Sequence, residues 1–570
     1  MLTLRRIGSI GEAIRDTIVT HKSNIALIEA DRHRENGRWT YRELQREAER
    51  FGALLQGLGF AAEDRCAILM QNQSKWIFSA VGAFWSGAVL VPVDYKLGAE
   101  EQLALVKHCA PKVLVTEYST WVTLRKLPQD ALERTIVLVT EAPEGAELGG
   151  KARRWETAPS KPFSFVTRSR EDLATIVYSS GTAGTAKGCM LTHDNYLEQA
   201  EILGRLFPIE EEDRYFSVLP TNHAIDFMVG FIVPLLFGAA IVHQRSLRPQ
   251  FIRASMKEYE ISHIALVPTI LKNLEKRIRE RLDELPDWQR RVVDSLTKVN
   301  EWVTAREPRH GVSRLLLKPL HDVMGGKLRM IFAGGTFIDR ELAEFFYDLG
   351  IPVVIGYGLT EASTVVTVND LKPFRGDTVG KPVPGVEVEI RNANEEGVGE
   401  VWVRGRTVMR GYLDEPELTA ETIVDGWLRT GDLGQIDVAG HLRLRGRAKN
   451  MIVTEGGKNI SPEDIEAAFD DLPGCEEHCV FAANYIWPTG KMTGEELVLV
   501  IRPGDDAATK GLVDEIARRN LRLPDFKRLS GYIVRAEEFP ATASLKIKRN
   551  VLAEELRNLP RAQTVHALAR

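Results

Sequence analysis

Short runs of hydrophobic residues alternate with amphipathic segments through the first two-thirds of the chain. The strand-like runs CAILM (66–70) and AVLVPV (88–93) are each followed by a helical pattern, around 74–85 and 100–108. The same alternation returns at 215–220, 239–244, 263–268, 328–335 and 352–358. Short apolar strands joined by longer helices are typical of parallel sheets covered by helices on both faces. The pattern therefore predicts an α/β fold.

The pattern changes from about Thr378, where strands alternate with Gly-rich turns. The segments VEVEI, GEVWVRG and HLRLRGR predict a small antiparallel sheet or barrel over 378–449. After Lys449 and Asn450, two helical and two strand-like segments predict a compact α+β domain. We therefore expect an N-terminal domain over 1–449 and a C-terminal domain over 450–570.

Residues 270–325 interrupt the strand pattern with three amphipathic helices, the first of which is LKNLEKRIRERLDEL. One interpretation is an inserted helical layer with a solvated outer face. The other is a basic surface that meets a membrane or an acidic partner.

Composition narrows the class of protein. The chain has 570 residues, 44% hydrophobic and 27% charged, with a net charge of −5. The charge argues against a general nucleic-acid binder, and five cysteines in so long a chain do not form a disulfide framework. The start lacks a signal-peptide pattern, and the longest apolar run, 227–242, contains Pro234 and is too short to cross a bilayer. We expect a cytoplasmic protein, with peripheral membrane contact and a homodimer both left open.

A glycine- and hydroxyl-rich segment, TIVYSSGTAGTAKGCMLTH (175–193), has the composition of a phosphate-binding loop. Aligned on Lys187, a Walker A loop would need glycine where Ala186 stands and a hydroxyl where Gly188 stands. A Rossmann glycine fingerprint is also missing here. A phosphate loop here would therefore follow another pattern than these two motifs, and an unrelated Gly-rich turn is the alternative.

The segment resembles the phosphate loop of the adenylate-forming superfamily, which includes acyl-CoA synthetases, luciferases and peptide-synthetase adenylation domains. The family usually has Thr at Ala183 and Pro at Ala186, so two positions depart from its pattern. The resemblance implies that the loop binds the phosphates of ATP. The residues involved are Ser179, Ser180, Gly181, Thr182, Gly184, Thr185 and Lys187.

A second family motif is VVIGYGLTEAS (353–363). The resemblance implies that Tyr357 stacks on adenine, Thr360 contacts phosphate and Glu361 holds Mg²⁺. Gly358 belongs to the same ATP/AMP site. Gly335, in AGGTFID (333–339), occupies the place of the family's adenine-edge turn. A Mg²⁺ ion is commonly held by one or two carboxylates together with substrate phosphates, which suits this set.

Further motifs follow in the family's order. GWLRTGDLGQID (426–437) implies that Asp432 accepts the ribose hydroxyls, and Arg447 is implied as a second ribose contact. Asn450 stands at the hinge, where the family usually has Asp. His223 occupies the place of a residue lining the acyl entrance, and a packed core histidine is the alternative.

The motif FPATASLKIKRNVL near the C-terminus matches the family form at Lys546, with Leu545 in place of the usual glycine. A leucine before the lysine is similar to the long-chain fatty acyl-CoA synthetase branch. The resemblance makes Lys546 the catalytic cation at the α-phosphate, together with Thr360 and Glu361.

The resemblance covers nearly the whole chain and implies a fold and a reaction. The N-terminal domain would hold two helix-covered sheets and a small distorted β-barrel, followed by a mobile α+β C-terminal domain. A fatty acid would react with ATP, with Mg²⁺, to give acyl-AMP and pyrophosphate, and the acyl group would then pass to CoA. Gly456 and Gly457 would line the CoA channel after the C-terminal domain rotates. A fatty acyl-AMP ligase that loads a carrier protein and an aryl-CoA ligase remain alternatives.

Overall fold

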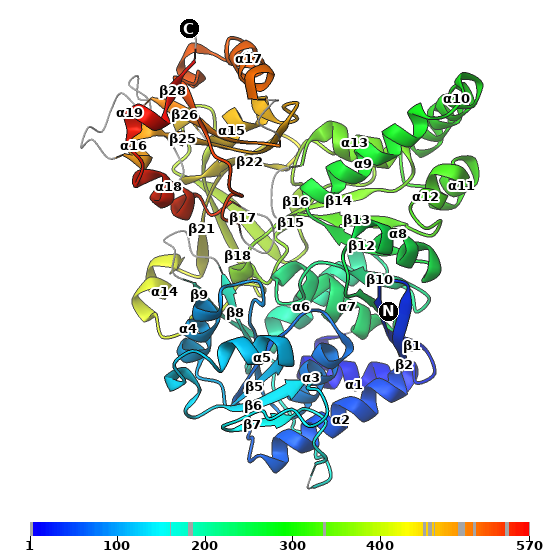
Figure 1. Ribbon diagram of the computed structural model, residues 1–570. Coiled ribbons are helices and arrows are strands. Elements are labelled where there is room, and N and C mark those ends of the chain that lie inside the picture. Colours follow the sequence, from blue (N-terminus) through cyan, green and yellow to red (C-terminus); the bar gives the residue numbers. More distant parts are fainter. Residues whose placement is uncertain are drawn as a thin grey trace.

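The computed structural model describes residues 4–159, 161–179, 186–334, 338–448, 452–453, 459–460, 462–487, 496–504, 509–541 and 547–568. Figure 1 shows two large sheets, a smaller antiparallel sheet and a C-terminal α+β unit. The predicted fold class is therefore confirmed, including the unit of alternating short strands after Thr378.

The larger sheet has nine strands in the order β16-β15-β14-β13-β12-β10-β11-β1-β2. Its six central strands run parallel, and β2, β15 and β16 add antiparallel edges. The bounds are β1 Ile25–Asp31, β2 Arg34–Thr40, β10 Arg214–Ser217, β11 Ala240–Gln244, β12 His263–Leu266, β13 Met330–Ala333, β14 Val353–Tyr357, β15 Thr367–Val368 and β16 Lys381–Pro382.

The second sheet has eight strands in the order β19-β9-β8-β4-β3-β5-β6-β7. Its strands from β8 to β7 pair in parallel, whereas β9 and β19 pair antiparallel at the other edge. The bounds are β3 Arg65–Leu69, β4 Val89–Pro92, β5 Val113–Glu117, β6 Ile136–Thr140, β7 Ala152–Arg154, β8 Leu173–Ser179, β9 Lys187–Thr192 and β19 Gly411–Tyr412.

A layer of helices lies between the two sheets and shares one apolar core with both of them. Trp76 and Phe231 meet edge to face within it, with ring centroids 5.2 Å apart. The layer holds α1 Ile10–Thr20, α2 Tyr41–Gly57, α3 Ser74–Trp85, α6 His193–Leu206, the π-helix η3 Asp226–Ile232 and α7 Val233–Phe237. Side-chain caps fix where three of these helices begin, at Ser9 before α1, at Thr40 before α2 and at Thr192 before α6.

Outer helices cover the remaining faces of the two sheets. On the eight-stranded sheet these are α4 Ala99–Cys109 and α5 Tyr118–Leu124. On the nine-stranded sheet, α8 Pro249–Glu258 and α13 Arg340–Asp348 cover the outer face together with the predicted helical insert. The insert comprises α9 Pro268–Asp283, α10 Asp287–Thr304, α11 His310–Leu316 and α12 Lys318–Val323.

The carboxyl ends of the parallel strands in the two sheets face each other. The Asn72 side chain, beyond β3, donates to Ser217 Oγ (2.9 Å) and to the Leu219 carbonyl (2.7 Å), beyond β10. Arg245, beyond β11, lies 3.1 Å from Glu117 at the end of β5. Because ligands of open α/β sheets bind at carboxyl ends of strands, this junction is where a site is expected.

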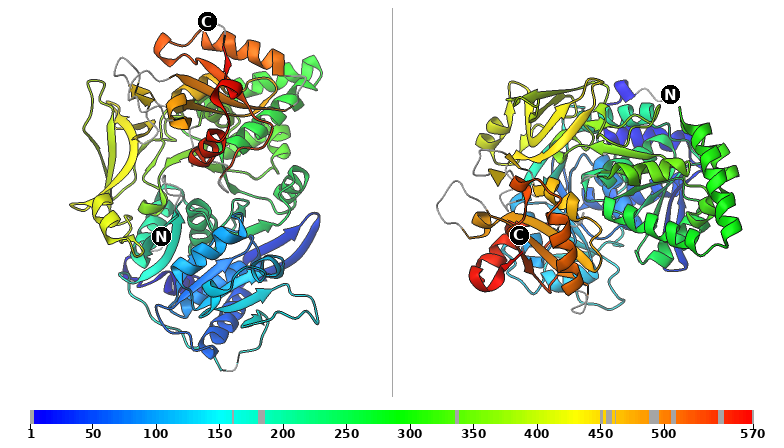
Figure 2. Two further views of the ribbon diagram at one scale, coloured as in Figure 1. Left: turned by 60° about the vertical axis from the view of Figure 1, so that its left-hand side comes forward. Right: turned by 90° about the horizontal axis from the view of Figure 1, so that it is seen from above.

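The five-stranded sheet is antiparallel, with β22 paired to β21. Its bounds are β17 Val386–Arg391, β18 Gly399–Gly405, β20 Ile423–Val424, β21 Trp427–Ile436 and β22 Leu442–Arg447, beside α14 Pro416–Thr422. It lies next to the C-terminal unit, which is at the end of the molecule opposite the eight-stranded sheet (Figures 1 and 2).

The C-terminal unit packs helices against a four-stranded sheet, β25-β26-β27-β28. Its bounds are α15 Pro462–Glu466, β25 Cys475–Ala482, α16 Ala483–Ile486, β26 Leu497–Pro503, α17 Thr509–Asn520, β27 Gly531–Val534, α18 Arg549–Arg557, α19 Arg561–Thr564 and β28 His566–Ala567. Arg549 binds both Glu466 carboxylate oxygens at 2.6 Å and so ties α18 to α15.

Candidate active site

Ser179 and Glu361 are brought together from different sheets. Ser179 ends β8, and Glu361 lies in a short 3₁₀ turn (Thr360–Ala362) that follows β14. The Ser179 hydroxyl donates to Glu361 Oε1 (3.1 Å), and the Tyr412 hydroxyl donates to the same oxygen (3.1 Å). Two donors on one oxygen orient a half-buried carboxylate that a cation can still reach.

The turn that carries Glu361 depends on Gly358. Ser363 and Thr364 have φ of 56° and 99°, so the chain bends back sharply after Glu361. A Cβ on Gly358 would lie 1.6 Å from the Thr364 carbonyl oxygen, which no side chain can tolerate. The Thr364 hydroxyl also donates to the Ala224 carbonyl (2.9 Å), so the turn is fastened to the loop that holds His223.

Asp432 is the centre of a second cluster. The Tyr357 hydroxyl donates to its Oδ2 (2.7 Å), and Arg447 Nε lies 2.8 Å from its Oδ1. Asp432 on β21 and Arg447 on β22 are direct cross-strand partners, so the hairpin itself sets this pair. Asp432 is 6% exposed. Since a carboxylate has about four acceptor positions, it can still accept hydrogen bonds from the two hydroxyls of a diol.

Burial and the Asp432 carboxylate raise the pKa of Tyr357 well above its ordinary value. The phenol therefore stays protonated and acts as a hydrogen-bond donor to Asp432. It is 7% exposed, so its ring also forms an apolar wall at the end of β14.

Lys187, predicted as a phosphate ligand, begins β9. Its ammonium lies 5.2 Å from the ring centroid of Tyr412, a cation–π geometry. Tyr412 thus contacts both the cation of Lys187 and the anion of Glu361. Sequence reasoning missed Tyr412, because it lies far beyond both motifs and only the pairing of β19 with β9 brings it there.

Cys189 lies beside the same cluster, with its sulfur 3.7 Å from the Ser179 hydroxyl. Burial, with the Glu361 carboxylate as a smaller cause, raises the pKa of this thiol well above its usual value. The thiol stays neutral and is a packing residue, since only a thiolate is an effective nucleophile.

His223 lies where three loops meet. Its Nε2 is 3.7 Å from Asp94 Oδ2, beyond β4, and the next residue accepts the bond from Thr364. Burial lowers the pKa of His223, and Asp94 only partly offsets this, so the ring is neutral at pH 7. The residue is partly exposed, which fits a position at the mouth of the junction better than one in a closed core.

Several predicted residues lie outside the described residues. They are Ser180, Gly181, Thr182, Gly184, Thr185, Gly335, Asn450, Gly456, Gly457 and Lys546. Near the last of these, Lys548 Nζ lies 3.7 Å from Glu101 Oε1 on α4. The segment that leads into α18 therefore reaches across to α4, near the Asp94 loop, although most of the C-terminal unit lies away from the eight-stranded sheet.

The chemistry of this donor set suits a nucleotide with its metal. Within the ranges described above, no three His, Cys, Asp or Glu residues gather to form a complete metal cage. Glu361 offers a single oriented carboxylate, which is enough when the phosphates of a nucleotide supply the other oxygen ligands. No helix of the described part of the chain is long and apolar enough to cross a membrane.

Comparisons with known proteins agree with this geometry. A family model described as AMP-binding enzyme matches residues 14–413. A methyl-dioxo-octahydro-indenyl-propanoyl:CoA ligase of Rhodococcus jostii (strain RHA1) is 28% identical over 545 residues, which cover 91% of this chain and 94% of the relative. Long-chain-fatty-acid–CoA ligase ACSBG2 of Gallus gallus is 27% identical over 484 residues, which cover 78% of this chain and 62% of the relative.

Solved structures show the same fold. O-succinylbenzoate CoA synthetase (MenE) from Bacillus subtilis, in complex with ATP and magnesium, has a TM-score of 0.72 at 22% identity and covers 95% of this chain and 99% of its own. ATP-bound MatB from Rhodopseudomonas palustris has a TM-score of 0.73 at 23% identity, covering 96% and 99%.

Proposed function

This chain belongs to the AMP-binding enzyme family and is an AMP-forming acyl-CoA ligase, and we propose that it activates a fatty acid. The observation that carries the activation of an acid with ATP is the pair of clusters at the end of β14. Within five residues, Tyr357 reaches Asp432 and Glu361 reaches Ser179. One cluster suits a ribose and the other suits phosphates with their cation.

The first half-reaction joins the acid to AMP. A carboxylate oxygen attacks the α-phosphorus of ATP, the bond to the bridging oxygen breaks, and pyrophosphate leaves. Negative charge is present on both reactants, so catalysis consists mainly of positioning and electrostatic stabilisation. Asp432 and Arg447 hold the ribose, Thr360 contacts a phosphate, and Lys187 with the loop that follows Ser179 binds the departing phosphates. Glu361 would hold Mg²⁺, and the bound ion would supply positive charge that neutralises the phosphates.

Lys546 supplies the cation at the α-phosphate and the attacking carboxylate. The contact of Lys548 with Glu101 supports this role, since it brings the segment next to Lys546 onto the N-terminal domain near the Asp94 loop. In the second half-reaction the thiol of CoA attacks the acyl carbon and AMP leaves. Rotation about Asn450 withdraws Lys546 and brings Gly456 and Gly457 to the CoA channel.

The fatty-acid assignment rests on two observations. Leu545 before Lys546 resembles the long-chain branch, and relatives that match this chain include long-chain fatty acid–CoA ligases. A second candidate is an acid with a polar ring system, because the Rhodococcus ligase, which acts on a dioxo compound, aligns over 91% of this chain.

The test is an assay of AMP release that depends on CoA, with acetate, octanoate, palmitate, benzoate and a ring-ketone propanoate as acids. We expect the highest kcat/KM with octanoate or palmitate. Turnover confined to benzoate or to the ring-ketone acid would overturn the fatty-acid proposal. Release of pyrophosphate without thioester formation, rescued by an acyl carrier protein, would instead identify a carrier-protein ligase.

A further inference from the structure

The helical insert extends away from the body of the molecule, with α10 at its outer edge (Figure 1). The inner face of α10 packs on α11 and α13. Asn300 and Thr304 are buried there, and Val293 and Leu296 pack against the apolar core of the nine-stranded sheet. This face accounts for the docking of α10, so its outer side chains are not needed to hold the helix in place.

The outer face of α10 carries a stripe of large apolar side chains. Trp288, Val292, Val299 and Trp302 are 64%, 49%, 47% and 81% exposed. At about 100° per residue they fall within a sector of roughly 80°. Leu315 on the neighbouring α11, 79% exposed, adds to the same region.

This concentration is unusual for a protein surface. Six of the fifteen large hydrophobic side chains exposed in the described part of the chain lie between residues 288 and 315. Single exposed apolar residues are normal, but a contiguous group indicates a binding surface. A tryptophan exposed to this degree forgoes the burial of one of the largest apolar side chains.

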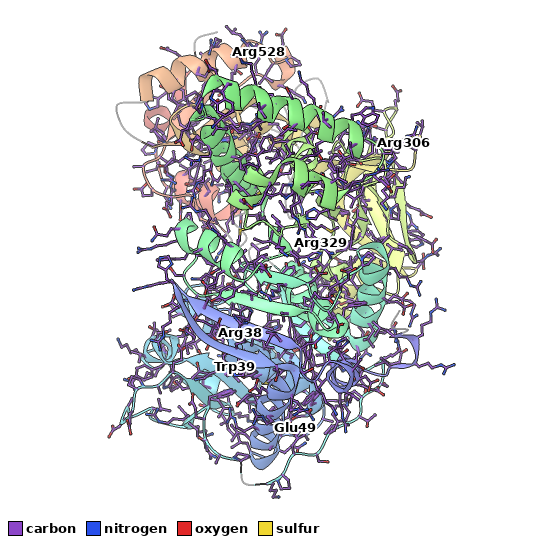
Figure 3. The ribbon with its side chains drawn as sticks, turned by 90° about the vertical axis from the view of Figure 1, so that its right-hand side faces the viewer. Arg38, Trp39, Glu49, Arg306, Arg329 and Arg528 are labelled. Carbon is purple, nitrogen blue, oxygen red and sulfur yellow. The ribbon has the colours of Figure 1, made fainter. Side chains whose placement is uncertain are left out.

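The same segment is basic in an acidic protein. Residues 287–316, which span α10 and α11, contain six Lys or Arg and four Asp or Glu, a net charge of +2, against −5 for the whole chain. Lys298, Arg306 and Arg314 have no ion-pair partner among the described residues. Figure 3 shows Arg306 at the outer edge of the insert. By helical spacing, Lys298 lies beside the apolar stripe, and Arg306 follows directly after the end of α10.

We propose that this surface, α10 with the exposed side of α11, binds an anionic lipid bilayer. A helix that combines Trp and aliphatic side chains with Lys and Arg lies in the membrane interface, with its apolar side chains among the acyl groups and its cations at the phosphates. The inference goes beyond the proposed reaction and does not depend on which acid is activated.

A second copy of the chain fits this surface less well. Four side chains on one helix cover far less than the about 800 Å² per partner of a standard protein interface. A copy would also bring a surface of the same positive sign against it, since a two-fold interface joins identical patches. Anionic lipid instead complements both the charge and the tryptophans.

The test is co-sedimentation of the full-length protein with sucrose-loaded vesicles. Vesicles of phosphatidylcholine with 30% phosphatidylglycerol should bind the protein, whereas pure phosphatidylcholine should bind it at least about tenfold more weakly. The double variant Trp288→Ser/Trp302→Ser should lose about tenfold in partition coefficient. Arg306→Glu/Arg314→Glu should lose more, and binding should weaken as salt is raised.

Matched controls lie elsewhere on the surface. Leu521→Ser/Leu559→Ser removes two exposed apolar side chains of the C-terminal unit. Arg134→Glu/Arg153→Glu, at exposed positions of the eight-stranded sheet, alters the net charge by as much as Arg306→Glu/Arg314→Glu does. Both should bind vesicles like the wild type. All variants should unfold at the wild-type temperature and release AMP at the wild-type rate with a water-soluble acid.

Three outcomes would overturn the proposal. The first is equal binding to neutral and anionic vesicles, and the second is unchanged binding by both insert variants. The third is a dimer in light scattering that Trp288→Ser/Trp302→Ser converts to monomer without any vesicle binding, which would assign the stripe to a second copy.

Discussion

At the scale of single residues, Tyr412 links the two charges of the proposed phosphate site. Its hydroxyl orients Glu361, and its ring faces the ammonium of Lys187. Neither interaction belongs to a motif visible along the chain. The carboxylate and the lysine can be named from sequence, but the side chain that fixes their relative position cannot.

Tyr412→Phe separates these two contacts, since it removes the hydroxyl and keeps the ring. Loss of a hydrogen bond to a charged group should lower the rate of pyrophosphate release about tenfold and raise the Mg²⁺ concentration needed for half-maximal rate. Tyr412→Leu, which also removes the ring, should be slower still. A Mg²⁺ titration of Tyr412→Phe that matches the wild type would contradict the positioning role.

At the scale of elements, the tight turn after β14 fixes the position of the Glu361 carboxylate. Gly358→Ala would force its Cβ against the Thr364 carbonyl, so the turn must open. We expect a loss of about 3 kcal/mol in the free energy of unfolding and a large loss of activity. Urea unfolding measures the first quantity.

The matched change is Gly311→Ala on α11, where an added Cβ meets nothing within 4 Å. Alanine is the better helix former, so this variant should be neutral or more stable by up to about 1 kcal/mol. If Gly358→Ala behaves in the same way, the turn tolerates a side chain and the steric argument fails.

The docking of α1 against α6 should depend on pH. His193, the first residue of α6, accepts a bond from the Ile10 amide (3.3 Å), and burial lowers its pKa to about 3, with Arg168 acting in the same direction and Asp172 opposing. The folded state therefore prefers the neutral ring. Its contribution is complete above the unfolded pKa of about 6.5 and is lost as the pH falls toward 3.

His193→Gln keeps an acceptor for the Ile10 amide but does not titrate. Between pH 7.5 and 5.5 the wild type should lose about 1.4 kcal/mol more unfolding free energy than this variant. Urea unfolding at the two pH values measures the difference. If both proteins lose the same unfolding free energy between these pH values, protonation of His193 is not coupled to unfolding.

The elements themselves follow closely from the sequence. The helix expected around 74–85 is α3 (Ser74–Trp85), and the apolar runs become strands because each is buried on both faces. Pairing between distant segments is different, since only long-range contacts decide it. The approach of Asn72 to Ser217, of Asp94 to His223 and of Tyr412 to Glu361 therefore could not be predicted.

At the scale of the whole molecule, two ion pairs between described residues join the C-terminal unit to the N-terminal domain. Lys272 on α9 lies 3.2 Å from Asp470, and Lys548 lies 3.7 Å from Glu101. Such partly exposed pairs contribute little stability. Weak pairs of this kind are compatible with the domain rotation proposed above.

Lys546→Ala should separate the two half-reactions. Pyrophosphate release should fall at least about 100-fold, because the cation at the α-phosphate is lost, whereas thioester formation from synthetic acyl-AMP should stay near the wild-type rate. Quenched-flow assays of each step measure this. Near-normal pyrophosphate release, or equal loss in both steps, would contradict the role assigned to Lys546.

The meeting of the two large sheets at their carboxyl ends has a consequence for how the enzyme matures. Asn72 and Ser217 are 145 positions apart, and Ser179 and Glu361 are 182 apart. Closing such long loops is slow, so these contacts form late in folding. During synthesis, Ser179 leaves the ribosome well before Glu361, Tyr412 and Asp432 exist. If Glu361, Tyr412 and Asp432 act as proposed, no nascent or truncated chain that lacks them adenylates an acid, and activity also waits for Lys546 near the C-terminus.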